Sequence, residues 1–369
     1  MASAGKHIER LVRRAFLSAL RLRTRRRGDP RALSSLVSPG ILLIRPDRIG
    51  DAIISVPVIR LLRERFPDAR IDMLLGEKNR SAAPLLPGLD STFVIPAAPL
   101  KLPGTLRRLR RRYDVAINLL AKDSASAGAI TALAGARYSI GFEGAAGGLY
   151  DVTIPSPPGD MHIVRATSLL LAPLGISPIG EEPARHAERL SIAIPEELRT
   201  GTRGRIEALP GSGASPIVAL NISGSGPEKF LGIDRYVQIA RLLGEAGLMP
   251  VFAAAPGDAA LLETIARKSG CSALPTTRSL AEFAAMLSHA DLIVTPDTSI
   301  VHVAAALGRP TVMMVPSPAT GTAWRPWGVP HALAVGDGVV ASIRPADLAT
   351  SIISLASATV GIAPTSSAS

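Results

Sequence analysis

From residue 41 onward, short apolar runs alternate with amphipathic stretches, and this alternation limits the fold more than any other feature of the chain. Strands of a parallel sheet are buried on both faces and need a crossover segment, usually a helix, between them. Residues 41–44 and 71–75 have the length and composition of such strands, and residues 56–65 between them have helical spacing of apolar residues. The sequence therefore predicts an α/β fold made of βαβ units and parallel sheets.

The alternation is interrupted once. Residues 196–216 are polar and contain several Gly and Pro residues, which is typical of a linker between domains. After them we expect strands at 217–222, 251–255, 292–295 and 311–315 and helices at 234–246, 259–268, 281–289 and 300–307. Because 369 residues are enough for two domains, we expect a Rossmann-like domain on each side of the linker.

These observations divide the chain into five parts. A basic leader comprises residues 1–36, the first Rossmann-like domain residues 37–195, and the linker residues 196–216. The second Rossmann-like domain comprises residues 217–345. Residues 346–369 are expected to form a C-terminal helix and a frayed tail rich in Ser and Ala.

The positive charge of the chain is concentrated in its leader. Residues 1–31 contain ten Lys and Arg side chains and two acidic ones, a net charge of +8 out of +11 for the whole chain. Apolar residues recur there with the spacing of one helix face, at Ile8, Leu11, Val12, Ala15, Phe16, Ala19 and Leu20. A basic amphipathic helix of this kind can lie in the headgroup layer of an anionic membrane. The alternatives are that the stripe docks on the protein's own body or that the leader is poorly ordered.

Several classes of protein are disfavoured by what the sequence lacks. Nucleic-acid binding is disfavoured because no recognised module accompanies the basic charge and only 13 of 369 residues are aromatic. Cys271 is the only cysteine, the six histidines lack metal-ligand spacing, and neither Asp-x-Asp nor Gly-x-Ser-x-Gly occurs. No apolar run reaches the roughly 18–20 residues of a spanning helix, and no secretory signal is present. We therefore expect a cytoplasmic protein without a metal site.

The first candidate site follows the first strand of the body. The motif Arg-Pro-Asp-Arg-Ile-Gly-Asp, residues 45–51, comes where this strand ends, and ligands of open parallel sheets bind outside the carboxyl ends of the strands. Asp51 is therefore a candidate general base. Its alternative role is to cap the following helix or to complement the helix dipole.

A loop of small residues follows the first strand of the second domain. Residues 221–229 read Asn-Ile-Ser-Gly-Ser-Gly-Pro-Glu-Lys. Small residues such as Ser223 and Gly224 allow backbone N–H groups to approach a phosphate, and Lys229 would add a positive charge. The loop lacks the Walker and dinucleotide-binding fingerprints, and a tight turn with an exposed lysine is the alternative.

The most informative segment follows the strand expected at 292–295. A helix begins there among hydroxyl residues, and its free N–H groups and dipole form an anion site. Thr298 and Ser299 suit a phosphate, whereas Asp297 suits a hydroxyl of a ribose or another sugar. His302 lies one turn into the helix. The alternatives are N-capping by Asp297 and a purely structural role for His302.

A second basic run precedes the apolar stretch at residues 115–117. It contains Arg107, Arg108, Arg110, Arg111 and Arg112. Such a run is usually a solvated helix face. The functional alternative is a contact surface for an acidic acceptor or for phospholipid.

Taken together and in this order, the motifs resemble glycosyltransferase family 9, the lipopolysaccharide heptosyltransferase-like family. The matching segments are residues 41–65 with Arg-Ile-Gly-Asp-Ala and Pro57, residues 113–118, Gly141-Phe142, the glycine loop with Lys229, and residues 297–305. The resemblance covers about residues 40–335. Phe230-Leu231 stands where many members have Trp-Pro, and Ser299 stands where many have glycine.

The resemblance implies a GT-B fold, in which two Rossmann-like parallel-sheet domains face each other across a cleft, and an inverting, metal-independent transfer of a sugar. It implies that Asp51 is the catalytic base. The donor-binding residues that it implies are Ser223, Gly224, Lys229, Asp297, Thr298, Ser299 and His302. The implied donor is ADP-heptose, a substrate, and no separate cofactor is implied.

The resemblance also suggests the partners. The acceptor would be an acidic, lipid-linked lipopolysaccharide core saccharide, which suits the positive charges of Arg107, Arg108, Arg110 and Arg111. Its membrane anchorage suits a peripheral enzyme whose leader binds the anionic cytoplasmic face of the inner membrane. The alternatives are another GT-B nucleotide-sugar enzyme, such as an epimerase, and a catalytically silent relative that binds a saccharide or the membrane.

Overall fold

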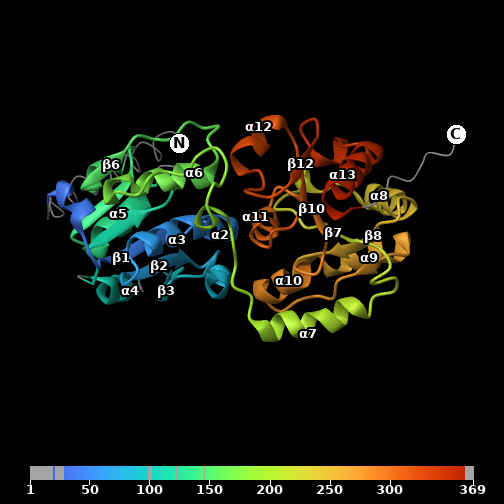
Figure 1. Cartoon of the computed structure of the whole chain (residues 1–369), viewed down its shortest axis with the longest axis horizontal. Coiled ribbons are helices and arrows are strands. Elements are labelled where there is room, and N and C mark those ends of the chain that lie inside the picture. The colour runs from blue at the N-terminus through green and yellow to red at the C-terminus, as the bar shows by residue number, and fades with distance from the viewer. Residues whose placement is uncertain are drawn as a thin grey trace, which may run out of the picture. The chain divides into compact units, whose positions relative to one another are not determined.

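The computed structural model describes residues 20, 29–98, 102–110, 112–121, 124–144 and 146–361, which form two compact units (Figure 1). The first unit consists of the described residues up to Ala83 and of Pro87–Glu188. The second consists of Pro84–Leu86 and of the chain from Arg189 onward. Three residues from the first half of the sequence thus belong to the second unit, where the carbonyl oxygen of the buried Leu85 accepts the N–H of Ala193 at 3.0 Å.

The first unit contains a parallel six-stranded sheet with the order β3-β2-β1-β4-β5-β6. Its strands are β1 (Gly40–Arg45), β2 (Arg70–Gly76), β3 (Ser91–Ile95), β4 (Val115–Asn118), β5 (Tyr138–Phe142) and β6 (Val152–Ile154). Its α-helices are α2 (Ile49–Ile54), α3 (Val56–Arg65), α4 (Leu102–Leu109), α5 (Ala125–Ala134) and α6 (Ile163–Ser168). The register places Leu43 beside Met73 and Ile117, and all three side chains are fully buried.

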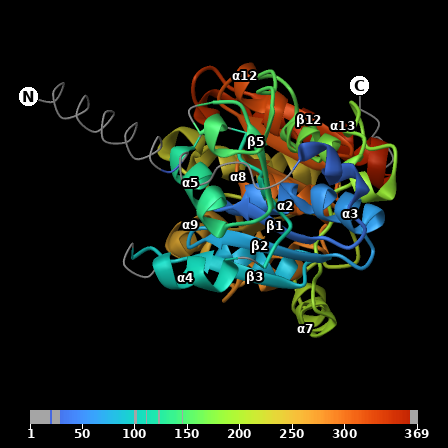
Figure 2. The same cartoon turned by 90° about the vertical axis from the view of Figure 1, so that its left-hand side faces the viewer.

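Helices cover both faces of this sheet. On one face, Leu109 of α4 and Ile130 of α5 pack with Leu42 and Ile44 of β1 in one apolar cluster. Figure 2 shows α3 on the other side of the sheet, where its buried residues include Leu62. Burial on both faces explains why the strands read as continuous apolar runs in the sequence.

The second unit contains another parallel six-stranded sheet, with the order β12-β11-β10-β7-β8-β9. Its strands are β7 (Ile217–Asn221), β8 (Met249–Ala253), β9 (Ser272–Ala273), β10 (Leu292–Pro296), β11 (Thr311–Val315) and β12 (His331–Val335). Its α-helices are α7 (Glu196–Glu207), α8 (Ile233–Glu245), α9 (Ala259–Ser269), α10 (Leu280–Leu287), α11 (Ser299–Ala306), α12 (Pro318–Gly321) and α13 (Pro345–Val360). When the strands of each unit are numbered from its own first strand, both sheets have the order 3-2-1-4-5-6.

The core of the second unit lies mainly under three helices. Tyr236 of α8, Leu262 of α9 and Ile352 of α13 pack in one cluster with Val218 and Phe252 of the central strands. Helix α7 packs along α10, and α11 packs against β10 and β11. This arrangement leaves the loops after β7 and β10 at the carboxyl edge of the sheet.

The elements expected from the sequence agree closely with the structure. The helix expected at 56–65 and the strand expected at 311–315 have these bounds, and the other expected elements differ by at most two residues at either end. The α/β class and the two parallel sheets are confirmed.

The boundary expected between the domains needs a correction. The segment 196–216, expected to be a linker, begins with the twelve-residue helix α7, and the chain passes from the first unit to the second after Glu188. Only Thr202 and Ile206 of α7 are buried, and the helix contains Gly201 and Gly204. A segment with so few apolar residues and two glycines resembles a polar linker in sequence, although it forms a packed helix.

The leader expected at residues 1–36 also extends less far than predicted. Residues 30–35 form a 3₁₀-helix, η1 (Pro30–Ser35), whose Leu33 is fully buried in the first unit. Leu20, the last residue of the apolar stripe, is 6% exposed and packs with Ala125 and Ala129 of α5. The other residues of the stripe lie outside the described residues. Within the part of the chain that the structure describes, no helix has the length and apolar composition needed to cross a bilayer.

Candidate functional site

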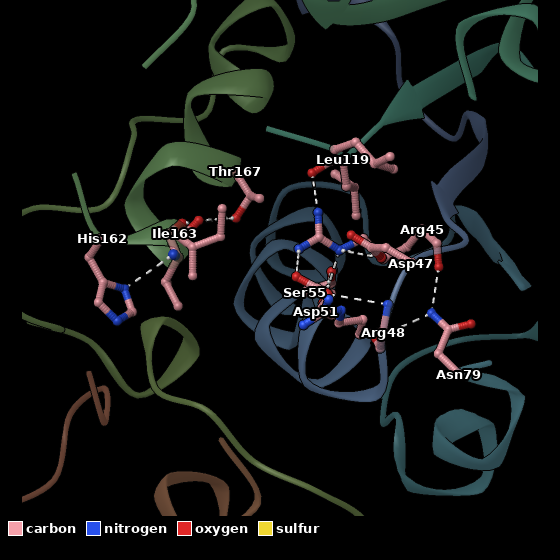
Figure 3. A network of polar contacts seen from close by, with 12 residues as sticks. Arg45, Asp47, Arg48, Asp51, Ser55, Asn79, Leu119, His162, Ile163 and Thr167 are labelled. Atoms are coloured by element: carbon pink, nitrogen blue, oxygen red, sulfur yellow. Dashed lines mark hydrogen bonds and ion pairs between the residues drawn. The ribbon is translucent and has the colours of Figure 1, made fainter. Parts of the chain in front are cut away.

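The candidate site of the first unit is built around Arg45, the last residue of β1 (Figure 3). Arg45 is 1% exposed, so partners within the protein must meet its charge. Its Nε donates to the carbonyl oxygen of Asp51 at 3.0 Å, and one terminal nitrogen lies 3.1 Å from Oδ1 of the same residue. The other terminal nitrogen donates to the carbonyl oxygen of Leu119. Arg45 therefore ties the end of β1 to α2 and to the segment after β4.

Asp51 lies in the first turn of α2 and is 7% exposed. Its Oδ2 accepts the backbone N–H of Arg48 at 3.2 Å, while Oδ1 accepts from Arg45. The helix-capping role that the sequence left open is thus present. Because a carboxylate offers about four lone-pair sites, these two bonds leave acceptor capacity for a substrate hydroxyl.

Asp47 is the second carboxylate beside Arg45. Its Oδ1 lies 3.4 Å from Nε of Arg45, and its side chain is 28% exposed. Burial raises the pKa of Asp47; the charge of Arg45 lowers this pKa in part, and that of Asp51 raises it further. The guanidinium of Arg45 therefore pairs with two carboxylates, that of Asp47 in the loop and that of Asp51 in α2.

The loop after β1 is held from the side of β2. The fully buried Asn79 donates from Nδ2 to the carbonyl oxygen of Arg45 at 2.7 Å and accepts the N–H of Gly76 at 2.8 Å. A Cβ at position 76 would lie 2.4 Å from the carbonyl oxygen of Pro46. The close approach of the two backbones thus requires glycine at this position.

Two further side chains of this region have structural roles. Ser55, whose position suggests an N-cap of α3, instead donates its hydroxyl to the carbonyl oxygen of Asp51 at 2.9 Å, and its own backbone is helical. His162, to which the sequence assigned no role, is 2% exposed and accepts the N–H of Val164 at the start of α6 (Figure 3).

In the second unit, an ion pair joins the two predicted donor loops. Lys229 ends a 3₁₀ turn after β7, and Asp297 directly follows β10. The Nζ of Lys229 lies 2.9 Å from Oδ2 of Asp297 and 2.6 Å from its carbonyl oxygen. The side chains are 13% and 21% exposed, respectively, so this charged pair is only partly shielded from solvent.

The start of α11 has the hydroxyl-rich form expected from the sequence. Thr298, not Asp297, is its N-cap, because Oγ1 of Thr298 accepts the N–H of Ile300 at 3.3 Å. Ser299 is the first residue of the helix. His302 is 4% exposed and lies one turn further, with its ring centroid 6.1 Å from that of Trp324.

The small residues after β7 have distinct surroundings. The hydroxyl of Ser223 donates to Oδ2 of Asp258 at 2.5 Å and accepts the N–H of Ala255 at 2.8 Å, so it is bonded to the segment that follows β8. A Cβ at Gly224 would lie 2.9 Å from Cβ of Lys229. Glycine at position 224 therefore allows the lysine its present place.

The predicted donor residues thus share one edge of one sheet. Ser223, Gly224 and Lys229 follow β7, whereas Asp297, Thr298, Ser299 and His302 follow β10, the strand paired with β7. Asp51 occupies the equivalent edge of the sheet in the first unit, after β1.

The arginines of the second basic run lie near the opposite edge of the first sheet. Arg107 and Arg108 are exposed on α4, Arg110 follows the helix and is exposed, and Arg111 lies outside the described residues. A Cβ at Gly40, the first residue of β1, would lie 2.9 Å from the carbonyl oxygen of Arg112. The basic run therefore ends beside the first residue of β1, whereas Asp51 follows the last residue of β1. This position favours contact with a charged surface over contact with the reacting hydroxyl of an acceptor.

The sequence analysis missed several polar residues that shape these sites. Arg45, Asn221 and Thr295 are buried polar residues at or near the ends of apolar strands, and each makes hydrogen bonds toward a candidate loop. A polar residue that ends a buried strand is the signal that could have identified them. Asn79 carries no such signal, because its partner in the loop after β1 is the carbonyl oxygen of Arg45, 34 positions away in sequence.

Among the described residues, no group of three or more His, Cys, Asp or Glu side chains is arranged as a metal site would require. Lys229 places one positive charge between the predicted donor loops.

Two parallel sheets of the order 3-2-1-4-5-6 in one chain, with polar loops at the carboxyl ends of their strands, are the architecture of the GT-B fold. The model of glycosyltransferase family 9 (heptosyltransferase) matches residues 104–332. The chain belongs to this family.

Curated relatives agree with this assignment. Lipopolysaccharide heptosyltransferase 3 of Escherichia coli (strain K12) is 25% identical over 300 residues, which cover 75% of this chain and 82% of that protein. Lipopolysaccharide heptosyltransferase 2 of the same strain is 25% identical over 289 residues, which cover 74% and 82%.

Solved structures of the family share the fold. The glycosyl transferase family 9 protein of Veillonella parvula DSM 2008 has a TM-score of 0.75 and 18% identity, with 87% of this chain and 97% of that chain covered. The E. coli ADP-heptose lps heptosyltransferase II has a TM-score of 0.67 and 20% identity, with 86% and 98% covered. The E. coli heptosyltransferase WaaC with ADP has a TM-score of 0.67 and 18% identity, with 85% and 99% covered.

Proposed function

We propose that this protein is an inverting, metal-independent glycosyltransferase that moves heptose from ADP-heptose to a lipid-linked lipopolysaccharide core saccharide. The observation that carries the proposal is the pairing of Lys229 with Asp297 beside the start of α11, at the carboxyl ends of adjacent strands. A departing diphosphate needs a positive charge and N–H donors, and this edge of the sheet offers both. The choice of donor is supported by the relatives that are named heptosyltransferases and by the one described with ADP.

The chemistry that we propose uses one carboxylate of the first unit. Asp51 accepts the proton of an acceptor hydroxyl, whose oxygen attacks the anomeric carbon of the donor. The bond from that carbon to the diphosphate oxygen breaks, the configuration inverts, and ADP leaves with the electron pair. Lys229 and the free N–H groups at Thr298 and Ser299 balance the negative charge that develops on the diphosphate.

The acceptor's lipid anchor implies that the enzyme works at a membrane surface. We propose that the basic leader and the exposed arginines of α4 hold the protein on the anionic cytoplasmic face of the inner membrane. The proposal is supported by the net charge of +8 in residues 1–31 and by the exposure of Arg107, Arg108 and Arg110.

The two alternatives make different demands on the protein. An epimerase would turn over a nucleotide sugar without a second saccharide, and a silent relative would bind a saccharide or membrane without turnover. Membership of family 9 and the presence of both Asp51 and Lys229 favour glycosyl transfer.

A panel of nucleotide sugars tests the proposal. Purified protein is melted with ADP-heptose, UDP-N-acetylglucosamine and GDP-mannose, and a ligand that binds the folded state raises the melting temperature. We expect ADP-heptose to give the largest increase. Addition of a heptose-deficient core saccharide should then give a product heavier by one heptose in mass spectrometry. Turnover of the donor without this product would support the epimerase, and binding without turnover would support the silent relative.

A further inference from the structure

A buried polar chain connects the two predicted donor loops beneath the Lys229–Asp297 ion pair. Asn221 ends β7, Thr295 belongs to the paired strand β10, and the two are 1% and 0% exposed. Nδ2 of Asn221 donates to Oγ1 of Thr295 at 2.9 Å. Oγ1 of Thr295 lies 3.2 Å from Oγ1 of Thr298, the N-cap of α11.

The same amide also holds the loop that follows β7. Oδ1 of Asn221 accepts the N–H of Ser223 at 3.4 Å, and Nδ2 donates to the carbonyl oxygen of Ser223 at 3.3 Å. One side chain is thus bonded to the start of the lysine loop and, through Thr295, to the start of α11. Within the described residues, this chain and the Lys229–Asp297 pair both join the two loops.

A bound ligand would affect the Lys229–Asp297 pair and the Asn221–Thr295 bond differently. If Lys229 binds a diphosphate, its ammonium group must direct an N–H to that anion, which weakens its bonds to Asp297. The bond between Asn221 and Thr295 faces no such competition because both residues are buried and already paired. A hydrogen bond between buried groups is costly to break, since each group would lose a partner without gaining water.

We propose that Asn221 and Thr295 are positioning residues that keep the lysine loop and the start of α11 at the separation required for one diphosphate. The inference rests on the proposed function, because it assumes that these two loops bind the donor. Both phosphates of a diphosphate must be met at once, so a shift of one loop relative to the other weakens the binding of ADP even when every contacting residue is present.

Substitution of Thr295 tests the proposal. Thr295→Val keeps the branched shape but removes Oγ1, whereas Thr295→Ser keeps Oγ1. A matched control is Thr311→Val, since Thr311 is equally buried in the neighbouring strand β11 but bonds to the carbonyl oxygen of Arg309 at the start of that strand. Hydrogen exchange of the ligand-free protein and calorimetric titration with ADP give two independent measurements.

We expect Thr295→Val to speed amide exchange in both segments 223–229 and 297–300 and to weaken ADP binding by about five- to tenfold, the range for one hydrogen bond. Thr295→Ser and Thr311→Val should exchange and bind like the parent protein. Asn221→Leu should weaken ADP binding at least as much, because it also removes the bonds to Ser223. The double variant with Thr295→Val should bind no more weakly than Asn221→Leu alone, because both changes break the same bond.

Two results would overturn the inference. One is parental exchange in residues 223–229 of Thr295→Val, because the hydroxyl would then not couple the loops. The other is parental ADP affinity in that variant, because the coupling would then not position the binding groups. A parent protein that gives no heat with ADP would instead contradict the proposed function, and the exchange measurement would still decide whether the loops are coupled.

Discussion

The guanidinium of Arg45 lies between the carboxylates of Asp47 and Asp51, and this arrangement gives each carboxylate a different surrounding. Asp51 is almost fully buried and has both oxygens engaged, whereas Asp47 is 28% exposed. An ion pair with a buried guanidinium keeps a carboxylate oriented and available as a proton acceptor. The arrangement is therefore compatible with a capping residue that is also a general base.

Asp51→Asn should lower turnover by about 10²–10⁴-fold, because an amide cannot accept the proton of an acceptor hydroxyl. ADP affinity should not change, since the proposed donor residues belong to the second unit. Initial rates and calorimetric titration measure the two effects. The matched control is Asp114→Asn, which alters a carboxylate that accepts the N–H of Gly40 at the other end of β1. Equal turnover in the two variants would leave Asp51 with capping as its only role.

The raised pKa of Asp47 predicts a dependence of stability on pH. A carboxyl group whose pKa is higher in the folded than in the unfolded state costs stability once it is charged, so the cost appears as pH rises from the unfolded value through the raised value. Asp47→Asn should therefore unfold at higher urea concentration than the parent at pH 7, and this difference should disappear near pH 4. A variant that is less stable than the parent at pH 7 would show that the attraction of Arg45 outweighs the burial.

Gly224→Ala should weaken ADP binding several-fold, because its Cβ would press on Cβ of Lys229, 2.9 Å away, and displace the ammonium group. Gly226→Ala is the matched control. The three atoms nearest to a Cβ at position 226 all belong to the carboxylate of Glu228, the far end of a flexible side chain that can turn aside. Titration with ADP compares the two variants, and equal affinities would mean that the position of Lys229 does not control binding.

At the level of residues, charged side chains in loops after strands could be predicted from the sequence. Residues whose role depends on partners distant in sequence could not. Lys229 and Asp297 stand out in loops, and the structure pairs them. The alternative cap of α11, Asp297, lies one residue too early, since Asp and Thr both suit that position and the extended backbone of Thr298 and its bond to Ile300 decide between them. Asn79 acts through the carbonyl oxygen of Arg45, 34 positions away, which no local pattern reveals.

Among the elements, α7 departs most from expectation. It makes polar contacts with α10 and the residues after it: Arg205 pairs with Glu282 of α10 at 2.7 Å, and Thr202 lies 3.1 Å from Nε2 of His289, which follows that helix. Periodicity detects strands and helices that bury a wide apolar face, so it located strands β1, β2, β7, β8, β10 and β11 and overlooked this helix. A helix fixed by polar contacts is also more sensitive to pH than one fixed by apolar packing.

Acidification should therefore loosen α7. Burial lowers the pKa of His289, and the nearby charges of Arg203, Arg199 and Arg309 lower it too. A histidine whose pKa is lowered in the folded state binds a proton more readily in the unfolded state. Stability is therefore lost as the pH falls below the pKa of an unperturbed histidine, about 6.5. Amide protection of α7 should fall between about pH 7.5 and 5.5 in the parent and less in His289→Gln, which cannot titrate. Equal losses in both proteins would assign the effect to other groups.

For the whole molecule, the leader is attached to the body through Leu20 and Leu33 among its described residues. Burial of Leu20 against α5 fixes the end of the apolar stripe on the first unit. Asp29 then caps η1 by accepting the N–H of Arg31 at 3.0 Å, so a truncation that spares the body should end at residue 28.

Deletion of residues 1–28 should abolish co-sedimentation with anionic vesicles and preserve turnover on a short soluble acceptor. Phe16→Glu should weaken vesicle binding even at low salt, because membrane attachment combines charge with apolar insertion. Neutral vesicles serve as the control and should bind neither protein. Equal pelleting of the full-length and truncated proteins with anionic vesicles would show that the leader does not attach the enzyme to the membrane.

The assignment of Pro84–Leu86 to the second unit has a consequence for recombination within the family. A genetic crossover at residue 188 would join the first half of one parent to the second half of another, but it would carry these three residues along with the wrong half. In the hybrid, Leu85 would come from one parent and Ala193 from the other. The backbones of these two residues are hydrogen-bonded, so the two parental segments would have to fit each other. Compatibility at this short exchanged segment, rather than at the crossover itself, would limit which acceptor and donor specificities evolution or engineering can combine.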